Sequence, residues 1–219
     1  MLERNPPAAP GALYATQKEY YRSMYSSAAP APWDEFFDGQ WLKDRLAFGP
    51  GARKGIALEI GAGKGRGAGI LVKAGYRCVA MDYLLEPMIH ASSGGDKRLF
   101  FVNADLFAAP FRDGIFNLAL DWGVFHHIRR KDTGLYISAV RRLLGEKGRL
   151  LLGCFSTRFR HPGERRRKRN FTLHHGHYDR YSTRAELKQA FGPWFEISSM
   201  EERAAGYYLL DMTLRKKMK

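Results

Sequence analysis

Residues 56–67 read Ile56-Ala-Leu-Glu-Ile-Gly61-Ala-Gly63-Lys-Gly65-Arg-Gly67, an apolar run that leads directly into four glycines at alternate positions. The apolar run predicts a buried strand, and the pattern from Gly65 to Ala74 predicts a helix. Glycine has no Cβ and accepts positive φ, so a ligand can lie against the backbone of the turn between them. The free N–H groups of the helix N-terminus would face that ligand. We therefore predict a ligand-binding turn; the alternative is a tight strand–helix turn that binds nothing.

The spacing of the glycines argues against a phosphate-binding turn. A dinucleotide site of the G-x-G-x-x-G type needs glycine at position 66, where this chain has Arg66, and a P-loop needs Ser or Thr after Lys64. Glu59 stands two residues before the first glycine, where its charge would repel a pyrophosphate and attract a cation. The pattern therefore favours a ligand with a cationic end.

Around this turn, short apolar runs alternate with helical stretches. Such alternation predicts a parallel sheet covered by helices on both faces, and the last two runs predict a hairpin. The expected fold class is α/β, a doubly wound, Rossmann-like sheet of seven strands, mostly parallel with an antiparallel C-terminal strand. The predicted strands are Ile56–Ile60, Arg77–Met81, Leu99–Val102, Phe116–Leu120, Arg149–Phe155 after a turn at Gly145–Gly148, Trp194–Met200 and Tyr207–Leu214. The predicted helices are Tyr14–Tyr25, Trp33–Phe48, Gly65–Ala74, Leu84–Ala91, one capped by Asp132 and one opened by a capping box at Thr183–Glu186.

Three of the predicted strands end in or lead into an aspartate. Asp82 ends the second strand, Asp105 follows the third, and Asp121 ends the fourth. Open α/β sheets bind ligands at the carboxyl ends of their strands, where Asp82 could accept both hydroxyls of a ribose and Asp105 could accept from an exocyclic amine. Each aspartate alone is more often a cap or turn residue, so it is their shared position that indicates a site.

Together these residues resemble the class I S-adenosylmethionine-dependent methyltransferases, over roughly residues 55–156. Glu59–Gly65 is similar to the family's first motif, whose glycines pass under the methionine part of the cofactor, and Phe116–His127 is similar to its fourth motif. The resemblance implies S-adenosylmethionine as cofactor and in-line transfer of its methyl group, with Asp82 at the ribose and Asp105 at the adenine amino group. The cofactor-binding residues expected on this basis are Glu59, Gly61, Ala62, Gly63, Gly65, Asp82, Tyr83, Asp105, Leu106, Asp121 and Trp122.

The residues expected at the methyl acceptor lie in three segments. His126 and His127 follow the fourth strand and are predicted as the catalytic base or as groups that orient the substrate; packing is the alternative. Tyr14 and Tyr21 belong to an N-terminal helical appendage, residues 1–54, that could close over the methyltransferase domain, residues 55–219.

The third segment is a basic, histidine-rich insertion at residues 157–181, where His177 and Tyr178 are expected to face the substrate. His174, His175 and His177 also suggest a metal, but a metal site needs converging ligands with outer partners, and no spacing here demonstrates them. The expectation is therefore a site without metal.

Composition narrows the function classes. The chain has 219 residues with 45% hydrophobic and 13% aromatic content, enough for a real core and against wholesale disorder. No apolar run approaches a membrane span and the N-terminus lacks an apolar signal core, while two cysteines suggest no disulfide scaffold, so a reducing, cytoplasmic setting is expected.

The net charge of +14 favours anionic partners, and seven of the basic side chains lie within residues 158–169. The leading hypothesis is a methyltransferase for a small-molecule nitrogen, oxygen or sulfur acceptor. The alternatives are an RNA or protein methyltransferase that uses the basic segment, and a non-catalytic cofactor-binding protein. The oligomeric state is not indicated.

Overall fold

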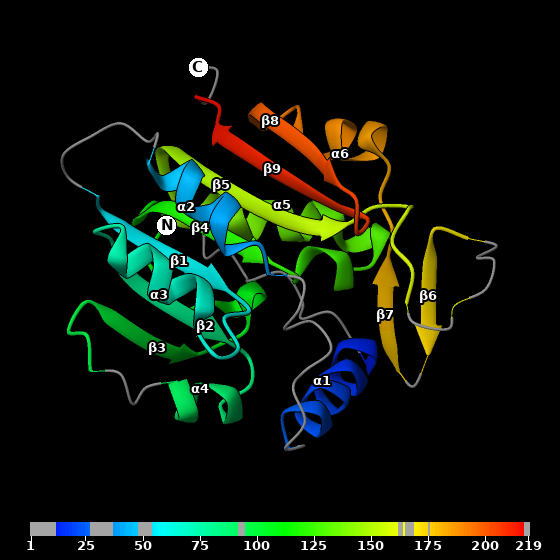
Figure 1. The fold of residues 1–219 in the computed structure, drawn as a ribbon, viewed down its shortest axis with the longest axis horizontal. Coiled ribbons are helices and arrows are strands. Elements are labelled where there is room, and N and C mark those ends of the chain that lie inside the picture. Colours follow the sequence, from blue (N-terminus) through cyan, green and yellow to red (C-terminus); the bar gives the residue numbers. More distant parts are fainter. Residues whose placement is uncertain are drawn as a thin grey trace, which may run out of the picture.

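The computed structural model describes residues 12–26, 37–47, 54–91, 95–161, 164, 169–174 and 176–216. Its centre is a seven-stranded sheet in the order β3-β2-β1-β4-β5-β9-β8 (Figure 1). Strands β1 to β5 are parallel, and β9 is antiparallel to both of its neighbours, as expected from the sequence. The strands are β1 Ile56–Ile60, β2 Arg77–Asp82, β3 Leu99–Asn103, β4 Phe116–Trp122, β5 Leu144–Phe155, β8 Phe195–Arg203 and β9 Tyr207–Leu214.

Helices cover both faces of this sheet. The α-helices are α1 Ala12–Tyr25, α2 Gly39–Ala47, α3 Arg66–Lys73, α4 Glu86–Ala91, α5 Thr133–Leu143 and α6 Arg184–Phe191, and the short 3-10 helices are η3 Leu106–Ala108, η4 Phe125–His127 and η5 Arg130–Asp132. Strand residues alternate between two apolar clusters, so that Leu58 joins α5 and α6 on one face while Ala57 joins α2 and α3 on the other. The doubly wound architecture is therefore confirmed.

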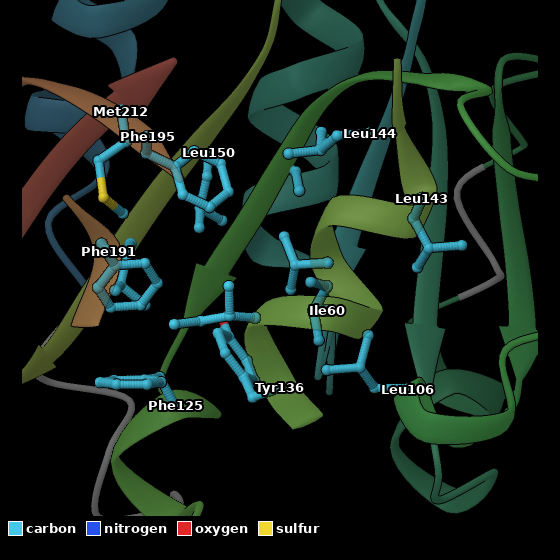
Figure 2. Packing of buried hydrophobic residues seen from close by; sticks show 14 of the residues in the cluster. Ile60, Leu106, Phe125, Tyr136, Leu143, Leu144, Leu150, Phe191, Phe195 and Met212 are labelled. Atoms are coloured by element: carbon cyan, nitrogen blue, oxygen red, sulfur yellow. The ribbon is translucent and has the colours of Figure 1, made fainter. Parts of the chain in front are cut away.

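The larger cluster anchors the segment that follows β4 (Figure 2). Phe125 in η4 is fully buried, with its ring centroid 5.0 Å from that of Tyr136 in α5 and 5.1 Å from that of Phe191 in α6. Because this residue is held in the core, the two histidines that follow it have a fixed position at the end of the sheet.

The order of the strands also determines where a ligand can bind. β1 lies between β2 and β4, and the chain leaves β1 and β4 toward opposite faces, which opens a crevice at their carboxyl ends. The register pairs Ile60 with both Met81 and Asp121, so the three strands end at the same level. The glycine turn begins at this level, directly after Ile60.

Several local predictions can be compared with the structure. β1 and β9 have the predicted bounds, and the capping box at Thr183 and Glu186 is present. Asp132 occupies the N-cap position of α5 as predicted, but its carboxylate makes no capping hydrogen bond and instead accepts one from the Tyr14 hydroxyl, at 3.2 Å. The predicted turn at Gly145–Gly148 is wrong, because these residues lie within β5 at a bulge where Lys147 has φ 57°.

The insertion contains a two-stranded antiparallel sheet, formed by β6 Phe171–His174 and β7 His177–Arg180, for which the sequence predicts no strands. β7 lies beside α1 at the carboxyl-end side of the large sheet (Figure 1). The predicted beginning of the second helix at Trp33, the basic residues 165–168 and His175 lie outside the described residues. Among the helices that are described, none is long and apolar enough to cross a membrane.

Candidate functional site

A cavity of about 820 Å³ lies at the carboxyl ends of β1, β2 and β4. Its walls come from the glycine turn, the ends of the strands, α1, η4 and β7. This volume is in the upper part of the range for ligand sites in proteins, so it suits a ligand larger than a nucleoside. Of the residues predicted from the sequence, the cavity is lined by Glu59, Gly61, Ala62, Gly63, Asp82, Tyr83, Asp105, Leu106, Trp122, His126, His127, Tyr14, Tyr21 and His177. Gly65, Asp121 and Tyr178 are not part of this lining, so their predicted contacts with cofactor or substrate stay predictions.

The glycine turn follows the cavity wall with its backbone bare. Gly61 and Gly63 have φ values of 66° and 51°, in the region that favours glycine. A Cβ on Gly61 would lie 2.2 Å from Cγ2 of Val124, and one on Gly63 would lie 2.6 Å from the Tyr25 hydroxyl. Both conformation and space therefore require glycine at these positions. Gly65 has a different place: it caps the N-terminus of α3 with φ 71°.

Glu59 holds α3 against β1. Its carboxylate accepts hydrogen bonds from the N–H of Gly67, at 3.1 Å, and of Ala68, at 2.8 Å. Burial raises the pKa of this carboxyl to about 8, against the lowering effect of these two hydrogen bonds. The side chain lines the cavity, but both of its oxygens accept hydrogen bonds from the helix N-terminus. The sequence pattern did not indicate this structural role.

Asp82 connects the end of β2 to the glycine turn. One carboxylate oxygen accepts from the N–H of Gly63, at 2.8 Å, and the other from the N–H of Leu84, at 2.9 Å. Burial raises the pKa of Asp82, although these hydrogen bonds act in the opposite direction. A carboxylate has about four acceptor sites, so this one keeps capacity for hydroxyl donors of a ligand in the cavity.

Asp105 lies where the chain leaves β3. It is exposed, and one oxygen accepts from the N–H of Phe107, at 2.9 Å, which caps η3. Leu106 beside it is buried in the core, while Tyr83 comes from the neighbouring strand end, and both side chains form part of the cavity wall. An acidic group beside an apolar wall suits an aromatic ring that carries an amine.

Asp121 acts beneath the cavity and not at its surface. It is fully buried, and its carboxylate accepts from the N–H groups of Gly123, at 3.1 Å, Val124, at 2.7 Å, and Phe125, at 3.1 Å, and from the hydroxyl of Tyr136. Burial raises its pKa to about 6. Asp121 thus builds the turn that brings Val124 and the two histidines to the cavity, and the predicted direct contact with cofactor is not supported.

The two histidines of η4 have different surroundings. His126 is buried and stacks on Phe155, with ring centroids 3.6 Å apart, and burial lowers its pKa well below the usual range. His127 has Nδ1 2.9 Å from a carboxylate oxygen of Asp179 in β7. His126 therefore stays neutral, whereas His127 is paired with an acid.

Asp179, which the sequence prediction missed, is the centre of a histidine cluster. It is fully buried, and besides His127 it contacts Nε2 of His161, at 2.9 Å, and Nε2 of His177, at 3.3 Å. Burial raises the pKa of Asp179, but the hydrogen bonds and charges of the histidines outweigh this and hold it below its usual value. The signal in the sequence was the spacing of His177 and Asp179, since residues two apart on a strand share a face, whereas Tyr178 points to the other face.

Helix α1 covers this cluster. The Tyr21 hydroxyl lies 2.8 Å from Nε2 of His177, and the ring of Tyr20 stacks on His177 with centroids 4.4 Å apart. At the other end of the helix, the Tyr14 hydroxyl accepts from the N–H of Arg129, at 2.9 Å. Between them, the Gln17 amide contacts the carbonyl of His127, at 3.5 Å, and the N–H of Tyr178, at 3.4 Å. The helix is thus fastened to both sides of the cavity by polar side chains.

Comparison with known proteins shows what this chain is similar to. Residues 58–152 match a family model described as a methyltransferase domain. No protein with a curated description matches the sequence of this chain. Among solved structures, a similar one is the 1,6-didemethyltoxoflavin-N1-methyltransferase of Burkholderia thailandensis with bound 1,6-didemethyltoxoflavin and S-adenosylhomocysteine, at TM-score 0.72 and 22% identity over 96% of this chain and 94% of that one.

Two further structures are similar at lower identity. The DhpI-SAM-HEP complex has TM-score 0.69 and 18% identity, over 94% of this chain and 99% of that one. The PH0226 protein from Pyrococcus horikoshii has TM-score 0.68 and 16% identity, over 90% of this chain and 99% of that one. At these identities the likeness concerns the fold, which extends over almost the whole chain.

Proposed function

We propose that the chain is a class I S-adenosylmethionine-dependent methyltransferase and that it methylates a nitrogen, oxygen or sulfur atom of a small molecule; its residues 58–152 match the methyltransferase-domain model. One observation carries the proposal. A single cavity combines a bare glycine turn flanked by Asp82 and Asp105 with an aromatic and histidine-rich part under α1. The first part suits the methyl donor and the second part suits an enclosed acceptor.

The residues on the donor side fit S-adenosylmethionine. Gly61 and Gly63 line the cavity with backbone and no side chain of their own, and Asp82 keeps acceptor capacity for the ribose hydroxyls. Asp105, beside Leu106 and Tyr83, would accept from the adenine amine. The cofactor supplies a methyl group already activated on a sulfonium, so the main task of the protein is to bring the acceptor to about 3–3.5 Å in line.

The acceptor side has the features needed for that positioning. α1 and β7 enclose it, which excludes water and strengthens electrostatic interactions within it. His127 faces the cavity with Asp179 behind it and is the first candidate to orient the acceptor or to take its proton; His126, buried and neutral, is the second. Separate His126→Ala and His127→Ala variants test this, because a base changes turnover across pH whereas a packing residue changes stability.

The size of the site favours a small acceptor. The cavity is covered by the chain's own helix, and structures of similar fold are titled as complexes with small molecules, didemethyltoxoflavin in one and HEP in another. RNA or protein remains the second candidate because seven basic residues lie within 158–169. That surface would bind phosphates with a steep dependence on salt.

The test is methyl transfer from labelled S-adenosylmethionine to a panel of small thiols, amines and phenols, with total RNA and bulk protein as separate arms. We expect label on at least one small molecule and none on the macromolecules. Asp82→Ala serves as the matched control, because its weaker cofactor binding should lower transfer to every acceptor alike. Label on RNA alone, lost at high salt, would replace the small-molecule proposal by the second candidate.

A further inference from the structure

Three polar atoms converge at the acceptor end of the cavity. Nδ1 of His127 lies 2.9 Å from Oδ1 of Asp179 and 3.2 Å from Nε2 of His177, and that Nε2 lies 3.3 Å from the same Oδ1. The atoms therefore form an almost equilateral triangle. Two of them come from β7 and one from η4, segments about 50 residues apart in the chain.

Hydrogen bonding does not account for the whole triangle. Asp179 is fully buried, yet its Oδ1 accepts no hydrogen bond of acceptable geometry from any described residue, despite the two histidine nitrogens within 3.3 Å. A buried carboxylate oxygen left without a hydrogen-bond donor costs free energy, so an unpaired one beside two nitrogens indicates a missing partner. A small cation lying between the three atoms would be such a partner.

We propose that His127, His177 and Asp179 bind one divalent transition-metal ion, of which Zn²⁺ is the representative. Zinc takes nitrogen and carboxylate oxygen at about 2.0–2.2 Å, which separates neighbouring ligand atoms by about 3.0–3.4 Å for angles between 90° and 109°. The three observed separations fall almost entirely within this range. Two histidines and one carboxylate are also a ligand set that leaves coordination positions open for a substrate.

The surroundings of the triangle complete the arrangement. The other oxygen of Asp179 is held by Nε2 of His161, at 2.9 Å, which fixes the carboxylate as outer partners fix metal ligands. His126 lies near enough for its ligand atom to be within 4.8 Å of those of His127 and Asp179. The expectation from the sequence was a site without metal, because histidine spacing alone could not show that η4 and β7 meet.

The inference rests on the proposed function for its role. An ion at this place would bind the acceptor through the atom to be methylated and lower the pKa of its O–H, N–H or S–H group. The acceptor would release its proton to bulk water as it enters the cavity. Its anion would then form the bond to the methyl carbon while the carbon–sulfur bond of the cofactor breaks and S-adenosylhomocysteine leaves. The substrate class is therefore a small molecule with an acidic heteroatom that can ligate a metal, such as a phenol, an imide or a thiol.

The experiment measures metal binding without any turnover. Tag-free full-length protein is stripped with EDTA, dialysed and titrated with ZnCl₂ in a calorimeter, and Co²⁺ is added to a second sample to record its visible absorption. We expect one ion per chain and cobalt bands typical of nitrogen and oxygen ligation. His177→Gln and His127→Gln should each weaken binding at least about 100-fold. Asp96→Asn changes a surface carboxylate that is paired with Arg98 and lies outside the cavity, so this control should bind zinc within about twofold of the wild type.

Absence of stoichiometric zinc binding, or equal affinity of His177→Gln and the wild type, would overturn the inference and leave a hydrogen-bonded histidine–aspartate network. Circular dichroism of each variant establishes that it is folded, and the cobalt spectrum of the wild type needs no variant. Titration of the metal-free protein with S-adenosylhomocysteine separates the two hypotheses. Cofactor binding without zinc binding rejects only the metal, whereas zinc binding without cofactor binding rejects only the proposed function.

Discussion

At the scale of single residues, Gly61 and Gly69 offer a direct comparison. Gly61→Ala places a side chain in a left-handed conformation and 2.2 Å from Val124, so we expect a loss of about 1–2 kcal/mol of stability from the backbone alone and a further loss from the contact. Cofactor affinity should fall as well, because the turn must move. Gly69→Ala, in the interior of α3 with nothing within 4 Å, should instead raise stability by up to about 1 kcal/mol. Chemical denaturation measures both; an unchanged Gly61→Ala protein would contradict the turn geometry.

Glu59 should make the stability of the ligand-free protein depend on pH. Its pKa is raised from 4.5 to about 8 in the folded protein, so the folded state holds a proton that the unfolded state releases between these values. The free energy of unfolding should therefore fall as the pH rises from 4.5 to 8, by at most about 1.4 kcal/mol per pH unit. Glu59→Gln removes this dependence. Urea denaturation of both proteins across this pH range measures the difference, and parallel pH curves would show that Glu59 keeps an ordinary pKa.

Asp82 is expected to decide cofactor affinity. Asp82→Ala removes the acceptor for Gly63 and the capacity for ligand hydroxyls, so the affinity for S-adenosylhomocysteine should fall at least about tenfold, or about 1.4 kcal/mol. Asp96→Ala is the matched control, since Asp96 is paired with Arg98 on the surface and does not line the cavity. Calorimetry that gives equal affinities for the two variants would remove Asp82 from the binding site.

At the scale of elements, the position of α1 is the feature most open to test. Tyr14→Phe removes the hydroxyl that contacts both Asp132 and the N–H of Arg129, which loosens one end of the helix. We expect a several-fold rise in KM for the acceptor with nearly unchanged affinity for S-adenosylhomocysteine. Steady-state kinetics and calorimetry on the same preparation measure the two quantities. A parallel change in both would mean that α1 serves the donor side as much as the acceptor side.

Some helices and strands were predicted correctly from the sequence and others were not, for physical reasons. Strand β1 and its glycine turn were predicted correctly because a buried parallel strand is apolar throughout and the turn permits few residue types. The β6–β7 pair was missed because its strands have four residues each and because β7 buries the polar side chains of His177, Asp179 and Arg180. The turn-building role of Asp121 was missed because a position at a strand end does not reveal that the carboxylate accepts hydrogen bonds from its own turn. Contacts between residues far apart in the chain, such as His127 with Asp179, produce no recognisable spacing pattern in the sequence.

At the scale of the whole molecule, one cavity joins the sheet edge, α1 and β7, so ligand binding should stabilise the entire fold. At a concentration 100 times its dissociation constant, S-adenosylhomocysteine should add about 2.7 kcal/mol, which raises Tm by about 5–10 °C for a chain of this size. Adenosine at the same concentration should raise Tm less than S-adenosylhomocysteine does, because it makes no contact with the glycine turn. Scanning calorimetry measures both shifts, and the absence of any shift with S-adenosylhomocysteine would reject the donor assignment.

The cover of the proposed acceptor side comes from outside the segment that forms most of the rest of the cavity. The glycine turn, Asp82, Asp105 and the two η4 histidines lie inside residues 58–152, whereas α1 and β7, which cover the histidines, lie before and after that segment. Mutations in these flanking segments can therefore change which acceptor is bound while the cofactor-binding residues stay the same. A new substrate could be acquired by exchanging α1 and the β6–β7 pair, without changes to the cofactor site.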